Sequence, residues 1–485
     1  MAQLRTRKDV WKFAEWDPIL LFYAKAIAKM QSRPMNDPTS WRYQAAVHDY
    51  IRANDPNAKP GDPLPKSRDQ KQFWRQCQHN SWFFLPWHRM YLTYFEQIVG
   101  AAVAELGGPK DWALPYWNYS DPSNPNARKL PPAFRASKLP DGTPNPLRVA
   151  ERNRGCNEGH NVADESEVNI RPCLIDPTYA AAPAGGNPGF GGPKTAFSHS
   201  GQVTGKLEAV PHGSVHVAVG GWMGAFETAG LDPIFWLHHC NIDRLWTVWL
   251  RRDSSHTDPH DPKWLKSLSF HFHDASGKAL SMTSNEVVDT SKPPMSYEYE
   301  DVSDPFPSAP KAAEKAARLP MPEETPEMVG ATEEPVTLTN QRSEARLAVK
   351  QPTGPARAAH DAGAPPRGIH LNFENITATG QPENYAVYLN LPPNSQPADH
   401  PELLAGILST FGAAESSRTD DEHPGGGVHR ALEVGEIVQT LQARKDWDPN
   451  HLRVTFIPKN RRTAGEETGA APPPIRVGRI SLYYS

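Results

Sequence analysis

Four histidines near the middle of the chain have a spacing that could place ring nitrogens around one metal ion. His212 and His216 are four residues apart, so on a helix both rings lie on the same face. His238 and His239 are adjacent, and on a helix their side chains would point about 100° apart. Only one of this second pair can therefore face the first pair, which predicts three imidazoles at one ion.

A second group of histidines lies nearer the N-terminus. His79 and His88 are nine residues apart, with His79 on the loop before the helix that His88 begins, and His48 lies in the middle of an earlier helical segment. Imidazole binds copper, zinc, iron and nickel. Hydrolytic zinc sites often include a carboxylate, yet these two groups contain only histidines and no HExxH motif occurs. A trigonal all-nitrogen site favours copper, which changes between its two oxidation states there.

The segments that carry these histidines have helical periodicity. Residues 86–106 keep apolar side chains at steps of three and four and begin at a proline, which is common in a first turn. Residues 232–252 do the same, with Asp232 placed to cap the helix. Residues 210–221 predict a short helix ended by two glycines, and residues 41–52 predict another. Four helices with inward histidines predict a four-helix bundle with a metal site in its core.

Length, charge and apolar runs limit the class of protein. A chain of 485 residues is too long for one compact core, so we expect two or three domains. The formal net charge of −4 provides no broad basic surface, so a nucleic-acid or membrane partner has little support. No apolar run approaches the roughly 18 residues that span a bilayer. The charged N-terminal residues lack the apolar region of a secretory signal, so we expect a cytoplasmic location, with export alongside a partner left open.

The cysteines are few. Cys77, Cys156, Cys173 and Cys240 do not form a disulfide framework. Cys156 and Cys173 lie in one polar region rich in glycine and proline, where they could form a single bridge or remain two thiols. The missing secretory signal favours two reduced thiols.

The composition divides the chain into three parts. Residues 1–302 hold nearly all tryptophans and the dense histidine set, which indicates a mainly α-helical domain. Residues 303–367 are rich in Pro, Ala, Glu and Lys, which predicts an extended linker or surface strap with one short helix at residues 311–318. Residues 368–485 alternate apolar and polar side chains in IHLNFENITA, NYAVYLNLP, LRVTFIP and IRVGRISLYYS, which predicts an all-β sandwich.

Two stretches resemble the copper signatures of tyrosinases, catechol oxidases and hemocyanins. HNSWFFLPWHRMYLTYFE resembles the first signature, and PHGSVHVAVGGWMG with DPIFWLHHCNIDRLW resembles the second. The match covers roughly residues 1–300. This resemblance implies two copper ions, with His238 a neighbour rather than a ligand. It assigns to copper A the histidines His48, His79 and His88, and to copper B His212, His216 and His239.

The resemblance also assigns roles to residues around the ligands. Cys77 lies two residues before His79, as in related fungal enzymes where such a cysteine forms a thioether to the histidine ring; otherwise it is a buried thiol. Phe226 resembles the aromatic residue that covers copper B in plant enzymes, or it is an ordinary core residue. Glu208 resembles the glutamate that holds a water near the entering phenol, or it is a surface residue.

For other positions the resemblance implies a structural role, and one position differs from the family motif. Asp243 and Arg244 are expected to orient ligand histidines or to form a structural ion pair. The sequence 297–299, Tyr-Glu-Tyr, resembles the motif that closes the catalytic domain of plant polyphenol oxidases. Gly213 follows His212 where many enzymes that hydroxylate monophenols have asparagine, which weakens the expectation of that activity. The remaining histidines, His199 among them, are expected to be structural or solvated.

The function that this resemblance implies is oxidation of phenols by O2. We expect a tyrosinase that converts monophenols and o-diphenols to o-quinones, with Glu208 acting through a water as the base. The alternatives are a catechol oxidase with little monophenol hydroxylation, a hemocyanin-like oxygen carrier and, disfavoured by the ligands, a zinc hydrolase. The C-terminal domain resembles domains that shield the copper pocket, or it is a folding or oligomer-contact module. A homo-oligomer is left open.

Overall fold

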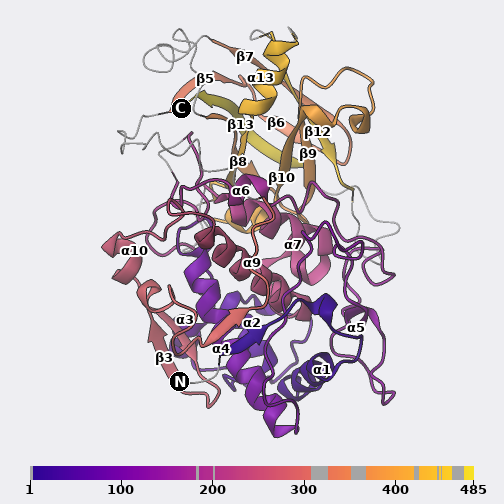
Figure 1. Ribbon diagram of the computed structural model, residues 1–485, viewed down its shortest axis with the longest axis vertical. Helices are drawn as coiled ribbons and strands as arrows, with labels where there is room; N and C mark the ends of the chain where they lie inside the picture. The colour runs from indigo at the N-terminus through magenta and orange to yellow at the C-terminus, as the bar shows by residue number, and fades with distance from the viewer. Residues whose placement is uncertain are drawn as a thin grey trace.

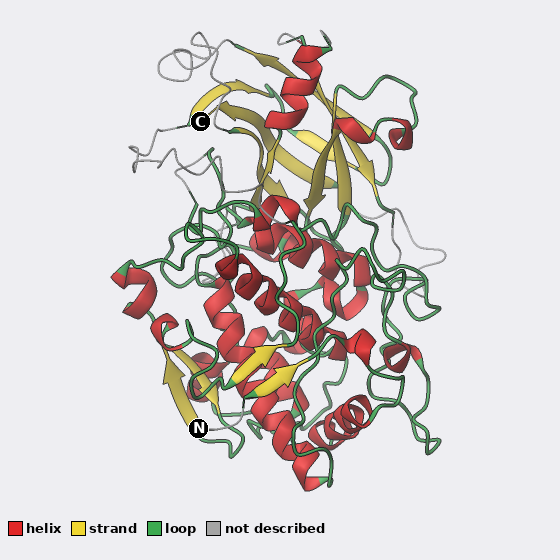
Figure 2. Cartoon of the chain, viewed as in Figure 1, coloured by secondary structure: helices red, strands yellow, loops and turns green. Residues whose placement is uncertain are grey.

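A helical domain and a β domain lie against each other in the computed structural model (Figure 1). The structure describes residues 4–181, 185–199, 203–306, 326–350, 368–419, 425–444, 447–448, 451–460 and 474–484. Figure 2 shows most helices gathered in one half of the molecule and most strands in the other. The predicted division into a mainly α domain and a C-terminal all-β domain is confirmed.

Four helical segments carry the histidines. They are α2 (Trp41–His48), α4 (Phe84–Glu105), α7 (Ser214–Val219) and α9 (Pro233–Arg251), with the single turn η3 (Glu208–Gly213) directly before α7. The buried stripes of α4 and α9 face each other, and α1 (Pro18–Gln31) packs on α4. The predicted four-helix arrangement is therefore confirmed, and its long members are α4 and α9.

Local signals explain where these helices begin and end. The Asp232 carboxylate accepts a hydrogen bond from Ile234 N at the start of α9, as the sequence predicts. The helix α2 ends at His48, whereas the sequence predicted this histidine in mid-helix; Asp49 is already extended, with φ −155°. After α7 the chain turns at Gly220, whose φ of 63° is available to glycine at little cost.

The rest of the helical domain consists of short elements. The short helices are η1 (Val10–Lys12), η2 (Arg52–Asn54), α3 (Ser67–Phe73), α5 (Pro132–Arg135), α6 (Arg171–Leu174), η4 (Gly221–Gly224), α8 (Phe226–Ala229), α10 (Pro262–Lys266) and η5 (Ser284–Glu286). Two small sheets are β1 (Arg5–Arg7) parallel to β4 (Tyr297–Tyr299), and β2 (Phe270–His273) antiparallel to β3 (Ala279–Met282).

The C-terminal domain is an antiparallel sheet folded over on itself, in the order β10-β9-β12-β7-β5-β13-β8-β11, with β6 paired to β13. Phe373 and Phe456, from opposite halves, meet inside at 5.8 Å between ring centroids. The strands are β5 (Glu327–Ala331), β6 (Val336–Leu338), β7 (Ser343–Val349), β8 (Ile369–Thr377), β9 (Asn384–Leu389), β10 (Leu404–Ser409), β11 (Val428–Glu433), β12 (Leu452–Pro458) and β13 (Ile475–Tyr484). Short helices accompany them: η7 (Pro397–Asp399), η8 (Pro401–Leu403), α12 (Ala413–Ser416) and α13 (Gly435–Ala443).

The predicted linker is wrong over part of its length. Residues 327–349 form β5, β6 and β7, which join the two halves of the sandwich, so the β domain begins well before residue 368. Ser343–Val349 does alternate between exposed and buried positions. Its short length, the small Ala345 at an inward position and the surrounding Pro, Ala and Glu hid that alternation in the sequence. The short helix predicted at residues 311–318 lies outside the described residues.

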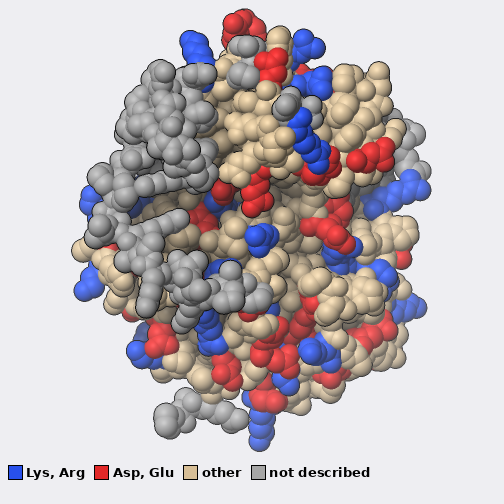
Figure 3. Space-filling view, turned by 45° about the horizontal axis from the view of Figure 1, so that its top comes forward, with Lys and Arg blue, Asp and Glu red and all other residues tan. Residues whose placement is uncertain are grey.

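In the part of the chain that the structure describes, each domain has its own apolar core, and a residue of each reaches the other: Val210 of the helical domain packs against the sandwich core, and Phe411 does the reverse. The sandwich core is made of aliphatic and aromatic residues from residue 329 onward, whereas Phe411, also from the C-terminal domain, packs in the core of the helical domain. Lysine, arginine, aspartate and glutamate side chains are mixed over the face shown in Figure 3. Within the described residues, no helix is both long and apolar enough to cross a bilayer.

Candidate metal centre

Three histidines of the N-terminal group converge. His48 ends α2, His79 lies on the loop before α4 as the sequence predicts, and His88 lies in the first turns of α4. Their ring centroids are 5.4 Å (His48–His79), 5.4 Å (His79–His88) and 5.8 Å (His48–His88) apart. The Nε2 atoms of His48 and His79 are only 3.3 Å apart. The three rings thus surround one point, as predicted for copper A.

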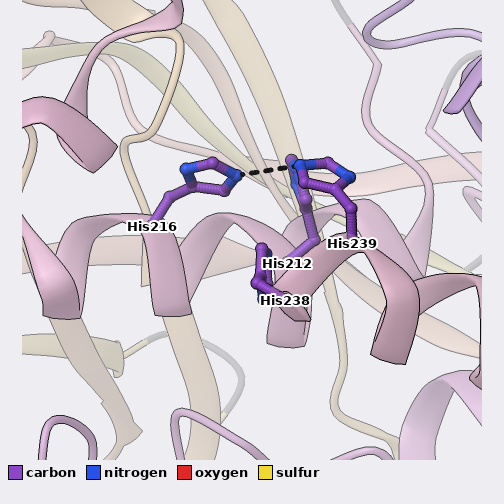
Figure 4. A group of neighbouring side chains, drawn as sticks. All are labelled: His212, His216, His238 and His239. Atoms are coloured by element: carbon purple, nitrogen blue, oxygen red, sulfur yellow. Dashed lines mark hydrogen bonds between the residues drawn. The ribbon is translucent and has the colours of Figure 1, made fainter. Parts of the chain in front are cut away.

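The second group converges in the same way. The ring of His212 lies 4.6 Å from that of His216 and 5.0 Å from that of His239. The Nε2 atoms of His216 and His239 are 3.3 Å apart, the contact drawn as a dashed line in Figure 4. These rings come from η3, α7 and α9, so the site forms only when all three segments pack together.

The two groups are adjacent and form a single centre. His88 and His239 stack with 4.5 Å between centroids and 9° between ring planes. His79 of the first group lies 5.8 Å from His212 of the second. Two ions held by these rings would therefore be close enough to share a small ligand.

Hydrogen bonds at Nδ1 fix the orientation of most of these rings. A backbone carbonyl accepts from Nδ1 in four of them: His48 to Phe226 (2.9 Å), His88 to Phe84 (2.8 Å), His212 to Glu208 (3.2 Å) and His216 to Met223 (2.7 Å). A carbonyl oxygen can only accept, so the ring hydrogen is assigned to Nδ1. The Nε2 lone pair of each ring is then directed into the centre.

This donor set fits a pair of metal cations. The Nδ1 of His79 faces the carboxyl group of Glu208 at 3.0 Å, and the Nε2 atoms of His48 and His79 face each other across 3.3 Å. The Nε2 atoms of His88 and His212 are buried and without hydrogen-bond partners among the described residues, which is costly without a metal.

Burial also keeps the imidazoles neutral. Removal from water lowers the pKa of His48 to about 4, despite the hydrogen bond to the Phe226 carbonyl and the nearby Asp49 carboxylate. Burial, with mutual repulsion between the rings, holds the pKa of His212 and of His239 well below the ordinary value. Neutral rings have a free lone pair at physiological pH, as copper ligation requires.

Glu208 lies within the centre and is not a surface residue. It is 5% exposed, and besides His79 both of its carboxylate oxygens accept from Asn80 N, at 2.9 and 3.0 Å. Burial raises the pKa of Glu208 to about 8, although the hydrogen bond from Asn80 and the charge of Arg430 oppose the shift. Glu208 is the first residue of η3, and its carboxyl group is thus fixed beside the predicted copper A ligands.

The prediction that Phe226 covers copper B is wrong. Its ring stacks on His79 of the first group, with 4.2 Å between centroids, because α8 packs against α2. The aromatic ring on the copper B side is Phe411, which stacks on His216 at 4.2 Å and 15° and lies 5.6 Å from His212. Nothing in the local sequence around Phe411 indicates this role, since its neighbours in the site come from another domain.

Gly213 packs against residues 409–411, the segment of the C-terminal domain that carries Phe411. A Cβ atom there would lie 3.2 Å from Ser409 Oγ and 3.4 Å from Phe411 Cβ. It would also lie 3.2 Å from the Glu208 carbonyl oxygen. A larger side chain at Gly213, such as asparagine, would therefore press against residues 409–411.

Cys77 is completely buried, and the structure gives it a partner that the sequence did not predict. Its Sγ lies 3.2 Å from Nδ1 of His199, a histidine expected to be structural or solvated. His199 Nε2 in turn lies 3.7 Å from the carboxylate of Asp49. Sγ also lies within 4.8 Å of ligand nitrogens of His48 and His79. The thioether to His79 stays a prediction. All four cysteines are in the described part of the chain and none forms a disulfide, as predicted.

His238 points its ring nitrogens at none of the described hydrogen-bonding groups. Its ring stacks on His212 at 5.4 Å and lies edge-on to His216 at 4.9 Å. Both nitrogens are buried, and no partner within the described residues bonds them. One nitrogen of His238 also lies within 4.8 Å of ligand nitrogens of His212, His216 and His239, so its role as a neighbour and not a ligand stays a prediction.

Asp243 and Arg244 take the structural alternative: each forms an ion pair, although with other residues and not with each other, and neither hydrogen-bonds a ligand histidine among the described residues. The Asp243 carboxylate accepts from Arg89 Nε at 2.5 Å and from the hydroxyls of Tyr297 (2.5 Å) and Tyr299 (2.6 Å). Arg244 donates to the Asp301 carbonyl oxygen at 2.6 Å. Asp243 thus holds the Tyr-Glu-Tyr strand against α4 and α9, so the structural role predicted for that motif agrees with the structure.

The fold and the two groups of three histidines define a type-3 binuclear copper protein. The family model for the common central domain of tyrosinase matches residues 38–252, and the model for the polyphenol oxidase middle domain matches residues 258–311. Residues 325–485 match a domain of unknown function. That last match begins just before β5, in agreement with the structure.

Known relatives confirm the assignment. The tyrosinase HcTyr1 of Hahella sp. (strain CCB-MM4) is 35% identical over 99% of both chains. A chloroplastic polyphenol oxidase of Malus domestica is 30% identical over 59% of this chain, which spans 46% of that relative. Solved structures of latent apple tyrosinase and of recombinant latent aurone synthase share the fold. Each has a TM-score of 0.62 and 22% sequence identity to this chain. Each alignment covers 100% of this chain, together with 98% of the apple tyrosinase and 89% of the aurone synthase.

The chain belongs to the tyrosinase and polyphenol oxidase family. Members of this family are oxidoreductases that bind two copper ions and act on phenols with O2.

Proposed function

We propose that this chain is a tyrosinase that oxidises both monophenols and o-diphenols to o-quinones. The carrying observation is that a buried carboxylate, that of Glu208, lies 3.0 Å from a ligand histidine in the centre where a phenol would bind. The 35% identity to a tyrosinase along the whole chain supports the same activity. The overall reactions are phenol plus O2 giving o-quinone and water, and two catechols plus O2 giving two o-quinones and two waters.

The protein groups have separate tasks. When bound, the two copper ions supply the activation of dioxygen and the transfer of electrons. The carbonyl oxygens that accept from Nδ1 of His48 and His216 keep those rings turned toward the centre. Phe226 and the surrounding aromatic core exclude bulk water from the first group of histidines.

Glu208 is the proposed acceptor of the phenolic proton, in the ionised form that the positive charge of bound copper ions would favour. A phenol coordinates a metal as phenolate, so its proton must leave when it binds. Asn80 N holds both carboxylate oxygens of Glu208, which fixes the acceptor without adding an opposing charge. An o-diphenol delivers electrons more readily, so loss of Glu208 should matter less for it.

The test compares tyramine with dopamine on the copper-loaded protein carrying Phe411→Ala, which removes the ring over His216. Oxygen uptake and quinone absorbance should appear with both substrates. Glu208→Gln should lower the tyramine rate at least roughly a hundredfold, the scale of lost general-base catalysis, and the dopamine rate only a few-fold. Glu298→Gln, at an exposed position, is the control, and copper content is measured in each variant.

Catechol oxidase activity alone is the second candidate, favoured by Gly213, which supplies no amide beside Glu208. Dopamine oxidation without any tyramine product would assign that function. Failure to turn over either substrate, with two coppers bound and O2 taken up reversibly, would instead indicate an oxygen carrier.

We also propose that the C-terminal domain closes the site. The Phe411 ring stacks on His216 of the second histidine group and is 4% exposed, so it fills space beside the ligands that a substrate ring would need. Two solved structures that share the fold over the whole chain, latent apple tyrosinase and latent aurone synthase, are latent enzymes by name, which supports the same idea here. Phe411→Ala should therefore oxidise dopamine faster than the unchanged chain. Equal rates at equal copper content would show that the ring does not obstruct the site.

A further inference from the structure

Arg430 reaches from strand β11 of the C-terminal domain toward the metal centre of the other domain. It is 6% exposed and donates to four oxygens. Nε donates to the Ser409 carbonyl at 3.1 Å, Nη2 to the Phe411 carbonyl at 2.7 Å, and Nη1 to the His429 carbonyl at 3.1 Å and to Thr204 Oγ1. Thr204 belongs to the helical domain, so this one side chain joins both domains and the segment that carries Phe411.

The guanidinium has no ion-pair partner within the described part of the chain. Burial lowers the pKa of Arg430 to about 10, with the Glu208 carboxylate opposing the shift, so the group remains charged at neutral pH. A buried charge is costly unless hydrogen bonds replace water. Because one of the replacing oxygens is that of Thr204, the full set exists only while the domains are docked.

Arg430 also fixes the shape of residues 409–412. Its two carbonyl partners, Ser409 and Phe411, flank Thr410, so the guanidinium spans the turn. Thr410 N donates to the Glu383 carbonyl at 3.2 Å on the far side. Gly412 follows with φ 79° and lies so close to Phe226 that a Cβ would be 3.0 Å from its ring. The turn therefore has little freedom while the guanidinium holds it.

On the other side of the boundary, the contacts continue to the centre. Thr204 Oγ1 also accepts from Asn80 Nδ2, and Asn80 N donates to Glu208. Hydrogen bonds thus run from Arg430 through Thr204 and Asn80 to the carboxylate that faces His79. Arg430 therefore both holds the turn at residues 409–412 and connects, through hydrogen bonds, to Glu208 beside the ligand histidines.

We propose that Arg430 is the positioning residue that keeps residues 409–412, and with them the Phe411 ring, inside the copper site. This rests on the proposed closure of that site by the C-terminal domain. Other contacts cross the boundary, such as Lys459–Asp164 (2.5 Å) and Asn384–Glu167 (2.7 Å). None of these others touches a carbonyl of the turn, so their loss weakens docking without freeing the turn itself.

Amide hydrogen exchange on the full-length, copper-free protein tests the proposal directly. Arg430→Met should raise exchange of the amides of residues 410–412 at least roughly tenfold, as loss of a local anchor does, and leave α4 unchanged. Arg430→Lys, which cannot span both carbonyls, should give a smaller rise. Arg346→Met, at an exposed position on β7, is the matched control and should change nothing.

A double-mutant cycle separates this role from a general contribution to the sheet. Thr204→Val removes the acceptor in the helical domain, and Thr204→Ser retains it. If the two residues act through one hydrogen bond, adding Thr204→Val to Arg430→Met should raise exchange little further. Additive effects, or exchange in Arg430→Met equal to that in Arg346→Met, would overturn the proposal. Should Arg430→Met fail to fold, Thr204→Val alone decides, because it leaves the guanidinium in place.

Activity provides the second arm. Copper-loaded Arg430→Met should oxidise dopamine without an activator at a rate approaching that of Phe411→Ala. If Phe411→Ala binds two coppers and oxidises no dopamine, the proposed function fails, while the exchange data still decide the role of Arg430. If Phe411→Ala is active and Arg430→Met remains as slow as the unchanged chain, the positioning role fails alone.

Discussion

At the scale of single residues, the centre depends on which ring nitrogen carries the hydrogen. Carbonyl oxygens of the protein hold Nδ1–H in four of the six histidines, so the Nε2 lone pairs converge before any metal arrives. The adjacent residues His238 and His239 differ in where their ring nitrogens lie. Both are buried on α9, yet only His239 brings Nε2 to 3.3 Å from His216.

The adjacent pair therefore provides a matched test of the copper assignment. His239→Gln should lower the copper content from two ions per chain to about one, because it removes a ring that completes copper B. His238→Gln should retain two. Both are measured by elemental analysis after dialysis against a weak chelator, with circular dichroism to check the fold. Loss of one copper in His238→Gln, and not in His239→Gln, would reverse the assignment.

At the scale of elements, a buried cluster of charges holds the helices that carry the ligands. Asp243 on α9 binds Arg89, the residue after a ligand histidine on α4, and the two tyrosines of β4. Burial alone would raise the pKa of Asp243, but Arg89 and Arg7 more than offset it and lower the pKa. The carboxylate is therefore ionised, and it fixes α4 against α9 one turn beyond His239.

Removing that charge should destabilise the helical domain. Asp243→Asn leaves Arg89 and Arg7 buried without a facing charge at this position, so the free energy of unfolding should fall by about 3–5 kcal/mol. Chemical denaturation of the copper-free protein measures this. Asp301→Asn, whose carboxylate is half exposed and 3.4 Å from Arg244, should cost less than about 1 kcal/mol. A similar small cost for both variants would contradict the structural role given to the cluster.

At the scale of the whole molecule, a second carboxylate sits at the domain boundary. Glu415 on α12 is 4% exposed and accepts from Phe226 N at 3.3 Å. Burial, together with repulsion from Glu227, raises the pKa of Glu415 from 4.5 to about 7, while Phe226 N and Arg418 oppose the shift. Glu227 itself is held by Asn54 Nδ2 at 2.6 Å and by Arg418 at 3.4 Å. Docking of the domains is therefore linked to protonation of Glu415.

The sign of this linkage predicts looser closure at higher pH. The docked form binds the proton more tightly, so its contribution to docking is complete below about pH 4.5 and is lost as the pH rises through about 7, at most ~3 kcal/mol. Exchange of the amides of residues 410–412 is measured at each pH in the unchanged chain and in Glu415→Gln, which cancels the intrinsic rate, and the two curves should diverge between about pH 4.5 and 7. Parallel curves would exclude Glu415 as the linked group.

Much of the site could be predicted because it depends on the spacing of residues within single helices and strands. Four-residue spacing puts His212 and His216 on one face whatever surrounds them, and Asp232 with Pro233 starts a helix from local hydrogen bonding and backbone geometry. Strands with clear alternation, such as Ile369–Thr377, were equally readable. Ser343–Val349 was missed because it is short, its inward positions include the small Ala345, and its neighbours in the sequence are rich in Pro, Ala and Glu; its partners β5 and β12 complete the sheet.

The sequence by itself indicated the family, the helices and the histidines expected to bind copper, since these follow from short-range periodicity and long ordered motifs. Only the tertiary structure decided which aromatic ring lies over His216, what Asp243 binds, and that Cys77 meets His199. Each is a contact between segments far apart in the chain. Such contacts depend on how two independently formed cores pack together, and no local pattern around Phe411 or Arg430 encodes the surface that it will meet.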